Sequence, residues 1–208
     1  MSKIKLWIWL AIPAATTLLA IAGLLWWRST IPSLQASGLL RSIVSGRSIS
    51  RYQVLDVEGK PLSNDQKNRL VREVLSPIVQ GRRVVSEKLL DLNSGHGISE
   101  VVLVDQAGKQ TTLSLSMTKT PDGISVPVSL LINNFWLYEA DPEGVNQTLT
   151  ADMYIRRIPL IRRDAPKLNE IGITFLQAEN GQILSPEQLA DSYESWRDDL
   201  PDQDPIGM

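Results

Sequence analysis

The sequence predicts an α+β protein: a single N-terminal transmembrane helix, then one domain with about two or three helices packed on a curved antiparallel sheet. Three patterns in the 208-residue chain support this fold class. The first is an uncharged apolar run at residues 6–27. The second is a pair of segments that begin with helix-capping motifs, and the third is a series of segments in which apolar and polar residues alternate.

The apolar run has the length and the ends of a membrane-spanning helix. Trp7 and Trp9 stand at one end, and Trp26 and Trp27 stand at the other. At about 1.5 Å per residue, the roughly twenty residues between the pairs span about 30 Å, the thickness of the hydrocarbon core of a bilayer. Because indole rings prefer the headgroup region, the four tryptophans are predicted to mark the two membrane interfaces.

A cleaved signal peptide is the alternative to a retained anchor. Lys3 and Lys5 form a basic start, and residues 20–22 resemble a cleavage site with small residues. The apolar core of a signal peptide is about 7–15 residues long, whereas this run continues to Trp27. We therefore expect the helix to be retained.

The orientation of the anchor depends on flanking charge. Lys3 and Lys5 precede the run, and Arg28, Arg41 and Arg47 follow it, so the positive-inside count is nearly balanced. A very short tail before a single apolar helix favours a C-terminal domain outside the cytoplasm. We expect a single-pass inner-membrane protein with a periplasmic domain.

The chain divides into four parts. A tail at residues 1–5 precedes the anchor at 6–27, one soluble α+β domain is expected at 31–199, and an acidic flexible tail at 200–208. The domain is long enough for one core and short for two.

Helices are expected near both ends of the domain. Residues 31–45 have loosely helical spacing, which Gly46 would end. Ser63 and Gln66 form a capping box ahead of an apolar face, and Pro77 should end that helix near Ser76. A second capping box, Ser185 with Gln188, precedes Leu189, Tyr193 and Trp196, which share one helix face.

The expected strands lie mostly between these helices. A Pro-Asp-Gly turn joins two alternating segments as a hairpin, and other segments extend the sheet to about five or six strands. A cystatin-like or NTF2-like architecture would satisfy this order of elements. The expected strands are residues 51–58, 98–105, 113–117, 124–132, 149–155 and 171–175.

Two clusters are candidates for a pocket or a partner surface. Trp136 and Tyr138 follow the strand at 124–132 and would form either the rim of a pocket or the closed end of the core. The pairs Arg156-Arg157 and Arg162-Arg163 flank an apolar stretch. That stretch is either a loop with an exposed apolar tip or a strand whose arginines pair with acids.

The composition favours no common catalytic or cofactor chemistry. The chain has no cysteine and a single histidine, His96, in a glycine-rich turn, so we expect no catalytic residue, cofactor or metal. An EF-hand-like start at Asp91 fails, because His96 and Val102 stand at the two positions that need glycine and a bidentate acid.

Charge is polarised along the chain. Residues 1–86 carry twelve Lys or Arg against four acids, and residues 187–208 carry seven acids against one Arg. The basic part would face anionic headgroups or simply be solvated. No basic stripe is interleaved with stacking aromatics, so a nucleic-acid partner is not expected.

These patterns support three classes of function. We expect a membrane-anchored scaffold or assembly subunit of a bacterial envelope complex, with the bilayer, other envelope proteins and a second copy of the chain as partners. The alternative is a membrane-tethered sensor that binds a small molecule at the open end of the sheet. A hydrolase is the least favoured class.

Overall fold

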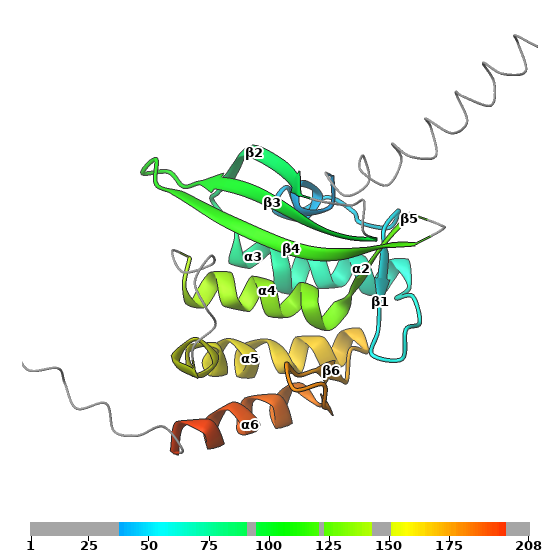
Figure 1. The fold of residues 1–208 in the computed structure, drawn as a ribbon, viewed down its shortest axis with the longest axis vertical. Helices are drawn as coiled ribbons and strands as arrows, with labels where there is room; N and C mark the ends of the chain where they lie inside the picture. Colours follow the sequence, from blue (N-terminus) through cyan, green and yellow to red (C-terminus); the bar gives the residue numbers. More distant parts are fainter. Residues whose placement is uncertain (1–37, 91–94, 121–122, 143–150, 199–208) are drawn as a thin grey trace, which may run out of the picture.

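The computed structural model describes residues 38–90, 95–120, 123–142 and 151–198 (Figure 1). The anchor at 6–27 with its four tryptophans, the tail at 1–5 and the acidic tail at 200–208 lie outside the described residues. None of the described helices is long and apolar enough to cross a membrane.

The domain is built on a mixed five-stranded sheet, which confirms the α+β class and corrects the expected antiparallel pairing. The first strand pairs in parallel with the fifth, whereas the other neighbours are antiparallel. In spatial order the strands are β1 (Gln53–Leu55), β5 (Gly123–Pro127), β4 (Gln110–Thr120), β3 (His96–Val104) and β2 (Arg83–Leu90).

The β3–β4 hairpin shows how the sequence pattern fixes the two faces of the sheet. Leu113, Leu115 and Met117 are buried, and the residues between them point to the other face. In the turn, the Asp105 carboxylate accepts the N–H groups of Ala107 and Lys109, both at 2.9 Å. The alternation and the turn together set the register, with Val104 opposite Gln110.

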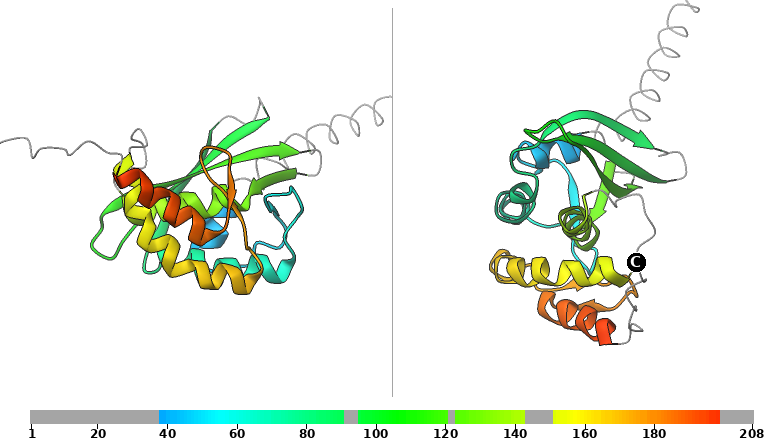
Figure 2. Two further views of the ribbon diagram at one scale, coloured as in Figure 1. Left: turned by 90° about the horizontal axis from the view of Figure 1, so that it is seen from below. Right: turned by 90° about the vertical axis from the view of Figure 1, so that its left-hand side faces the viewer.

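Helices cover one face of the sheet in successive layers (Figures 1 and 2). The layer nearest the sheet contains the helical residues 38–44, the helix α4 and one continuous helix made of α2, η1 and α3. The helix α5 lies beyond α4, and α6 is outermost. The elements are α2 (Asn64–Leu70), π-helical η1 (Val71–Leu75), α3 (Ser76–Ile78), α4 (Val128–Ala140), α5 (Ala151–Ile171) and α6 (Pro186–Asp198). A small hairpin of β6 (Leu176–Gln177) and β7 (Ile183–Leu184) joins α5 to α6.

Both predicted capping boxes are formed. The Ser63 hydroxyl accepts the N–H of Gln66 at 3.2 Å, and the Gln66 side chain accepts the N–H of Ser63 at 3.0 Å. Ser185 and Gln188 repeat the same two bonds at the start of α6. Gly46 ends the helical residues 38–44 with a φ of 63°, as predicted.

Three expected strands are wrong in part or entirely. The strand at 124–132 ends at Pro127, where α4 begins, because Pro127 ends the ladder and Val128, Leu131, Ile132 and Phe135 are buried at helical spacing. The segments at 149–155 and 171–175 contain no strand in their described residues, since α5 runs from Ala151 to Ile171.

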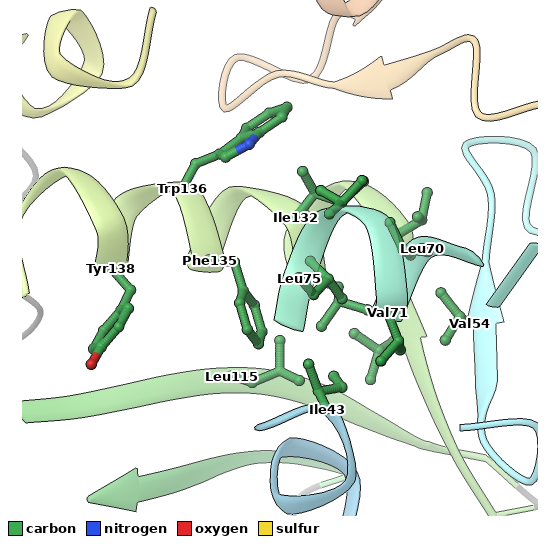
Figure 3. Packing of buried hydrophobic residues seen from close by; sticks show 14 of the residues in the cluster. Ile43, Val54, Leu70, Val71, Leu75, Leu115, Ile132, Phe135, Trp136 and Tyr138 are labelled. Carbon is green, nitrogen blue, oxygen red and sulfur yellow. The ribbon is translucent and has the colours of Figure 1, made fainter. Parts of the chain in front are cut away.

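The core lies between the sheet and the first helical layer. Figure 3 shows Phe135 and Tyr138 directed from α4 toward the sheet, whereas Trp136 leaves α4 on the opposite side. Leu115 of β4 lies below Phe135, and all these side chains are almost fully buried. The helix α4 is therefore packed between the sheet and α5.

Candidate functional site

The two aromatic candidates are buried rather than placed on a rim. Trp136 has no exposed surface and donates from Nε1 to Asp164 Oδ2 at 2.9 Å. The Tyr138 hydroxyl lies 2.6 Å from Thr111 Oγ1 and accepts a hydrogen bond from Arg82. Of the two sequence interpretations, the structure therefore favours the closed core.

The four candidate arginines lie on helix α5, not on a loop or a strand. Ile158 and Ile161, which belong to the predicted apolar tip, are buried at 4% and 0% exposure. The prediction missed the helix because Pro159 lies inside it. Both Pro159 and Pro166 face solvent, where the loss of an N–H donor is least costly.

The exposed arginines Arg156 and Arg162 pair with acids. Arg156 lies 2.6 Å from Asp152, one turn earlier in α5. Arg162 lies 3.2 Å from Asp191 and also contacts Glu194, both in α6. The Arg156 pair lies within α5 and the Arg162 pairs join α5 to α6, although surface pairs of this kind contribute little to stability.

The buried Asp164 is the centre of a network between α4 and α5 whose other charged members, Arg163 among them, are partly exposed. Arg163 donates to Glu139 at 2.6 and 2.8 Å, and to Asp164 at 2.7 and 3.0 Å. The Asp164 carboxylate has no exposed surface and also accepts from Lys167 at 3.0 Å. Burial alone would raise the pKa of Asp164, but hydrogen bonds from Arg163, Trp136 and Lys167 outweigh it and hold the pKa below its ordinary value.

Arg157 is the most buried arginine of the four, with 2% of its side chain exposed. Its guanidinium lies 4.4 Å from the ring centre of Tyr154 and 5.1 Å from that of Tyr193. It donates to Glu179 at 2.9 Å, and the Tyr193 hydroxyl donates to the same carboxylate. Burial and the Glu179 carboxylate raise the pKa of Tyr193 against the opposing effect of Arg157, so the phenol remains a donor at neutral pH.

A cavity of about 300 Å³ opens beside Arg157, between α4 and the β6–β7 hairpin. Leu130, Asn133, Asn134 and Leu137 line it from one face of α4, since they recur at helical spacing. Within the described residues, Asn133 Oδ1 and Arg157 Nε are buried without a hydrogen-bond partner. Both residues line the cavity, but these two atoms have almost no accessible surface, so their residues rather than these atoms face a ligand in the cavity.

A second cavity of about 430 Å³ shares Pro127 and Leu130 with the first. It is mainly apolar, with Leu90, Ile98 and Met117 among its lining residues. His96, predicted as an exposed turn residue, is exposed as the first residue of β3 and lines this cavity beside Thr118.

The sequence predicted that residues 133–138 could form the rim of a pocket at the end of a strand; Asn133 and Asn134 do line the cavity, but from helix α4. The four-residue spacing between Leu130 and Asn134 was the signal that placed them on one helix face. Among the described residues, no group of three or more His, Asp or Glu side chains is arranged to hold a metal ion.

No protein-family model, curated protein or solved structure matches the chain. Its function is therefore argued from the residues above.

Proposed function

We propose that the chain is a single-pass scaffold or assembly subunit of a bacterial envelope complex. Residues 6–27 anchor it in the inner membrane, and the α+β domain makes protein–protein contacts in the periplasm. We assign it no reaction, because arginines of α5 are engaged in pairs that join α5 to the β6–β7 turn, to α6 and to α4.

The observation that supports an assembly role is an apolar pair on the β6–β7 hairpin. Ile183 lies opposite Gln177, and Phe175 is two residues before Gln177, so all three side chains share one face of the hairpin. Phe175 is 52% exposed and Ile183 is 54% exposed, whereas Leu176 on the other face is fully buried. The aromatic side chain of Phe175 and the branched aliphatic side chain of Ile183 are thus both directed toward solvent.

We propose that this pair inserts into an apolar pocket of another membrane protein. A large aromatic residue beside polar neighbours is typical of the residues that dominate binding energy at interfaces. Burying the exposed half of Phe175 removes about 100 Å² of apolar surface from water, a gross hydrophobic gain of about 2.5 kcal/mol before the cost of ordering the interface.

The test is purification of the full-length chain from its native membrane in mild detergent, with mass spectrometry of what accompanies it. We expect stoichiometric membrane partners for the wild type and their loss for the double variant F175S/I183S. The control V85S/I98S replaces two apolar residues of similar exposure, 49% and 40%, on the sheet. Retention of partners by F175S/I183S would overturn the role of the hairpin, and a wild-type chain that purifies alone would overturn the scaffold function.

The small-molecule alternative is favoured by a different observation, the 300 Å³ cavity that the polar residues Asn133, Asn134 and Arg157 help to line. Its volume is near the lower limit for a ligand site. Native mass spectrometry of the full chain tests this alternative: a retained small molecule that Asn133→Leu removes would support it, and a mass without any addition would not.

A further inference from the structure

Four arginines surround one cavity on the basic side of the domain. Arg41 comes from the helical residues 38–44, Arg47 follows the turn at residues 45–46, Arg82 precedes β2, and Arg83 is the first residue of β2. The cavity has a volume of about 370 Å³, enough for a phosphate group with part of the molecule that carries it. Residues about forty positions apart in sequence thus bring their positive charges to one place.

One wall of the cavity is held in position by buried contacts. Arg82 donates to Thr111 Oγ1 at 3.0 Å and to the Tyr138 hydroxyl, and its guanidinium lies 4.9 Å from the centre of the Tyr138 ring. Thr111 and Tyr138 are both buried, so they fix the Arg82 guanidinium before any ligand arrives.

Negative charge around the cavity is small. Glu87 is the acid nearest to Arg41, at 3.3 Å, and its side chain is 6% exposed. Burial raises the pKa of Glu87 despite the attraction of Arg41, so the carboxylate is a weakened counter-ion. Within the described part of the chain, no acid lies within ion-pair distance of Arg47 or Arg83.

Three carbonyls at the end of the neighbouring helix already accept hydrogen bonds, which weakens their repulsion of an anion in the cavity. The carbonyl groups of Arg41, Ser42 and Ile43 accept the N–H groups of Ser45, Arg47 and Gly46, at 3.0, 2.8 and 2.9 Å. The Ile43 carbonyl also accepts from the Ser76 hydroxyl at 2.8 Å. The helix end is closed, and the arginine side chains dominate the electrostatics of the cavity.

We propose that this cavity binds a phosphate group and that the group belongs to an anionic phospholipid of the membrane holding residues 6–27. Arginine is suited to phosphate because its planar guanidinium donates two parallel hydrogen bonds. Gly38 is only eleven positions after Trp27, so the helix that carries Arg41 begins within about 40 Å of the end of the anchor. The lipid source rests on the proposed membrane anchor, whereas phosphate binding by the cavity does not.

The test uses the full-length chain in nonionic detergent and measures the anisotropy of fluorescent phosphatidylglycerol during titration. Each basic residue near an anionic lipid surface changes binding about fivefold, so R47Q/R83Q should bind about 25-fold more weakly. R72Q/R156Q is the matched control, because it removes the same charge from two exposed arginines elsewhere; it should bind within about twofold of the wild type. R47K/R83K, which keeps the charge, should retain most of the binding.

Equal binding by R47Q/R83Q and the control would overturn the site, provided that circular dichroism shows both variants folded. Competition by inorganic phosphate separates the two sources of the ligand. If inorganic phosphate displaces the lipid as effectively as unlabelled phosphatidylglycerol does, the cavity is a phosphate site but the lipid assignment is wrong. A wild-type chain that binds the lipid but purifies without partners would refute the scaffold function alone.

Discussion

The network around Asp164 gives the sharpest quantitative prediction. Asp164→Ala leaves Trp136 Nε1 buried without an acceptor, which costs about 1–3 kcal/mol. It also removes the bonds from Arg163 and Lys167, whose side chains are 40% and 41% exposed, so we discount each to about 1 kcal/mol. The sum is about 3–5 kcal/mol, a large part of the stability of an ordinary domain, and should lower Tm by roughly 10 °C.

Asp164→Asn separates charge from hydrogen bonding. The amide oxygen still accepts from Trp136, so we expect a loss of only about 1–2 kcal/mol at neutral pH. Because the folded pKa of Asp164 is lowered, its stabilisation is fully present above the ordinary aspartate range and is lost as pH falls through the folded pKa. The wild type and Asp164→Asn should therefore converge in stability in acid.

Urea unfolding of the full-length chain, followed by circular dichroism across this pH range, measures both effects. Asp191→Asn is the control, because Asp191 pairs with Arg162 at a side chain that is 71% exposed, and it should change stability by less than about 0.5 kcal/mol. The reasoning would be refuted if Asp164→Ala lowered the free energy of unfolding by less than about 1 kcal/mol. It would also be refuted if the difference in this free energy between the wild type and Asp164→Asn did not shrink as the pH falls.

Three further changes test other parts of the structure. Burial raises the pKa of Glu87, so its contribution to stability is present in acid and is lost as pH rises through the folded pKa. In urea unfolding, Glu87→Gln should therefore gain stability relative to the wild type as pH rises above about 4, and a constant difference would contradict this. Ser185→Ala removes the cap of α6 and should cost about 1 kcal/mol, with faster amide exchange in the first turn of α6 than Ser195→Ala produces. Gly46→Ala places a side chain at a φ of 63° and should cost about 1 kcal/mol by the same unfolding assay, whereas an unchanged midpoint would show that the turn relaxes.

Local chemistry made much of the fold predictable. Ser63 and Ser185 identified two helix starts because a capping box satisfies backbone donors with side chains only three residues away. The alternation of Leu113, Leu115 and Met117 with polar residues identified β4. This pattern is also local, because neighbouring side chains on a strand point to opposite faces of the sheet.

Elements whose pattern is ambiguous or interrupted were missed. The residues after Pro127 alternate and also repeat at helical spacing, and only packing against both the sheet and α5 selects the helix. Strand β2 was not predicted because its register shifts between Val84 and Ser86, which breaks the alternation. Parallel pairing of β1 with β5 depends on the whole topology, which no local motif records.

The candidate site was predictable only in part. The sequence singled out Arg157 by its place in a cluster, but its partner Glu179 lies 22 positions later, on the far side of the α5–β6 connection. The four arginines of the basic cavity were visible as an excess of charge, yet their convergence requires the turn at Gly46 to meet the start of β2.

The parallel pairing of β1 with β5 also has a consequence for the order in which the chain folds. Gln53 and Ser125 are 72 positions apart, whereas Val104 and Gln110 of the β3–β4 hairpin are six apart. Closing the longer loop costs about 2 kcal/mol more in chain entropy. The hairpin is therefore expected to form early and β1 to dock late, after α2 has supplied the apolar surface that covers it. Until β1 docks, β5 is an unprotected edge strand, so the refolding chain is most exposed to association with other chains along that edge.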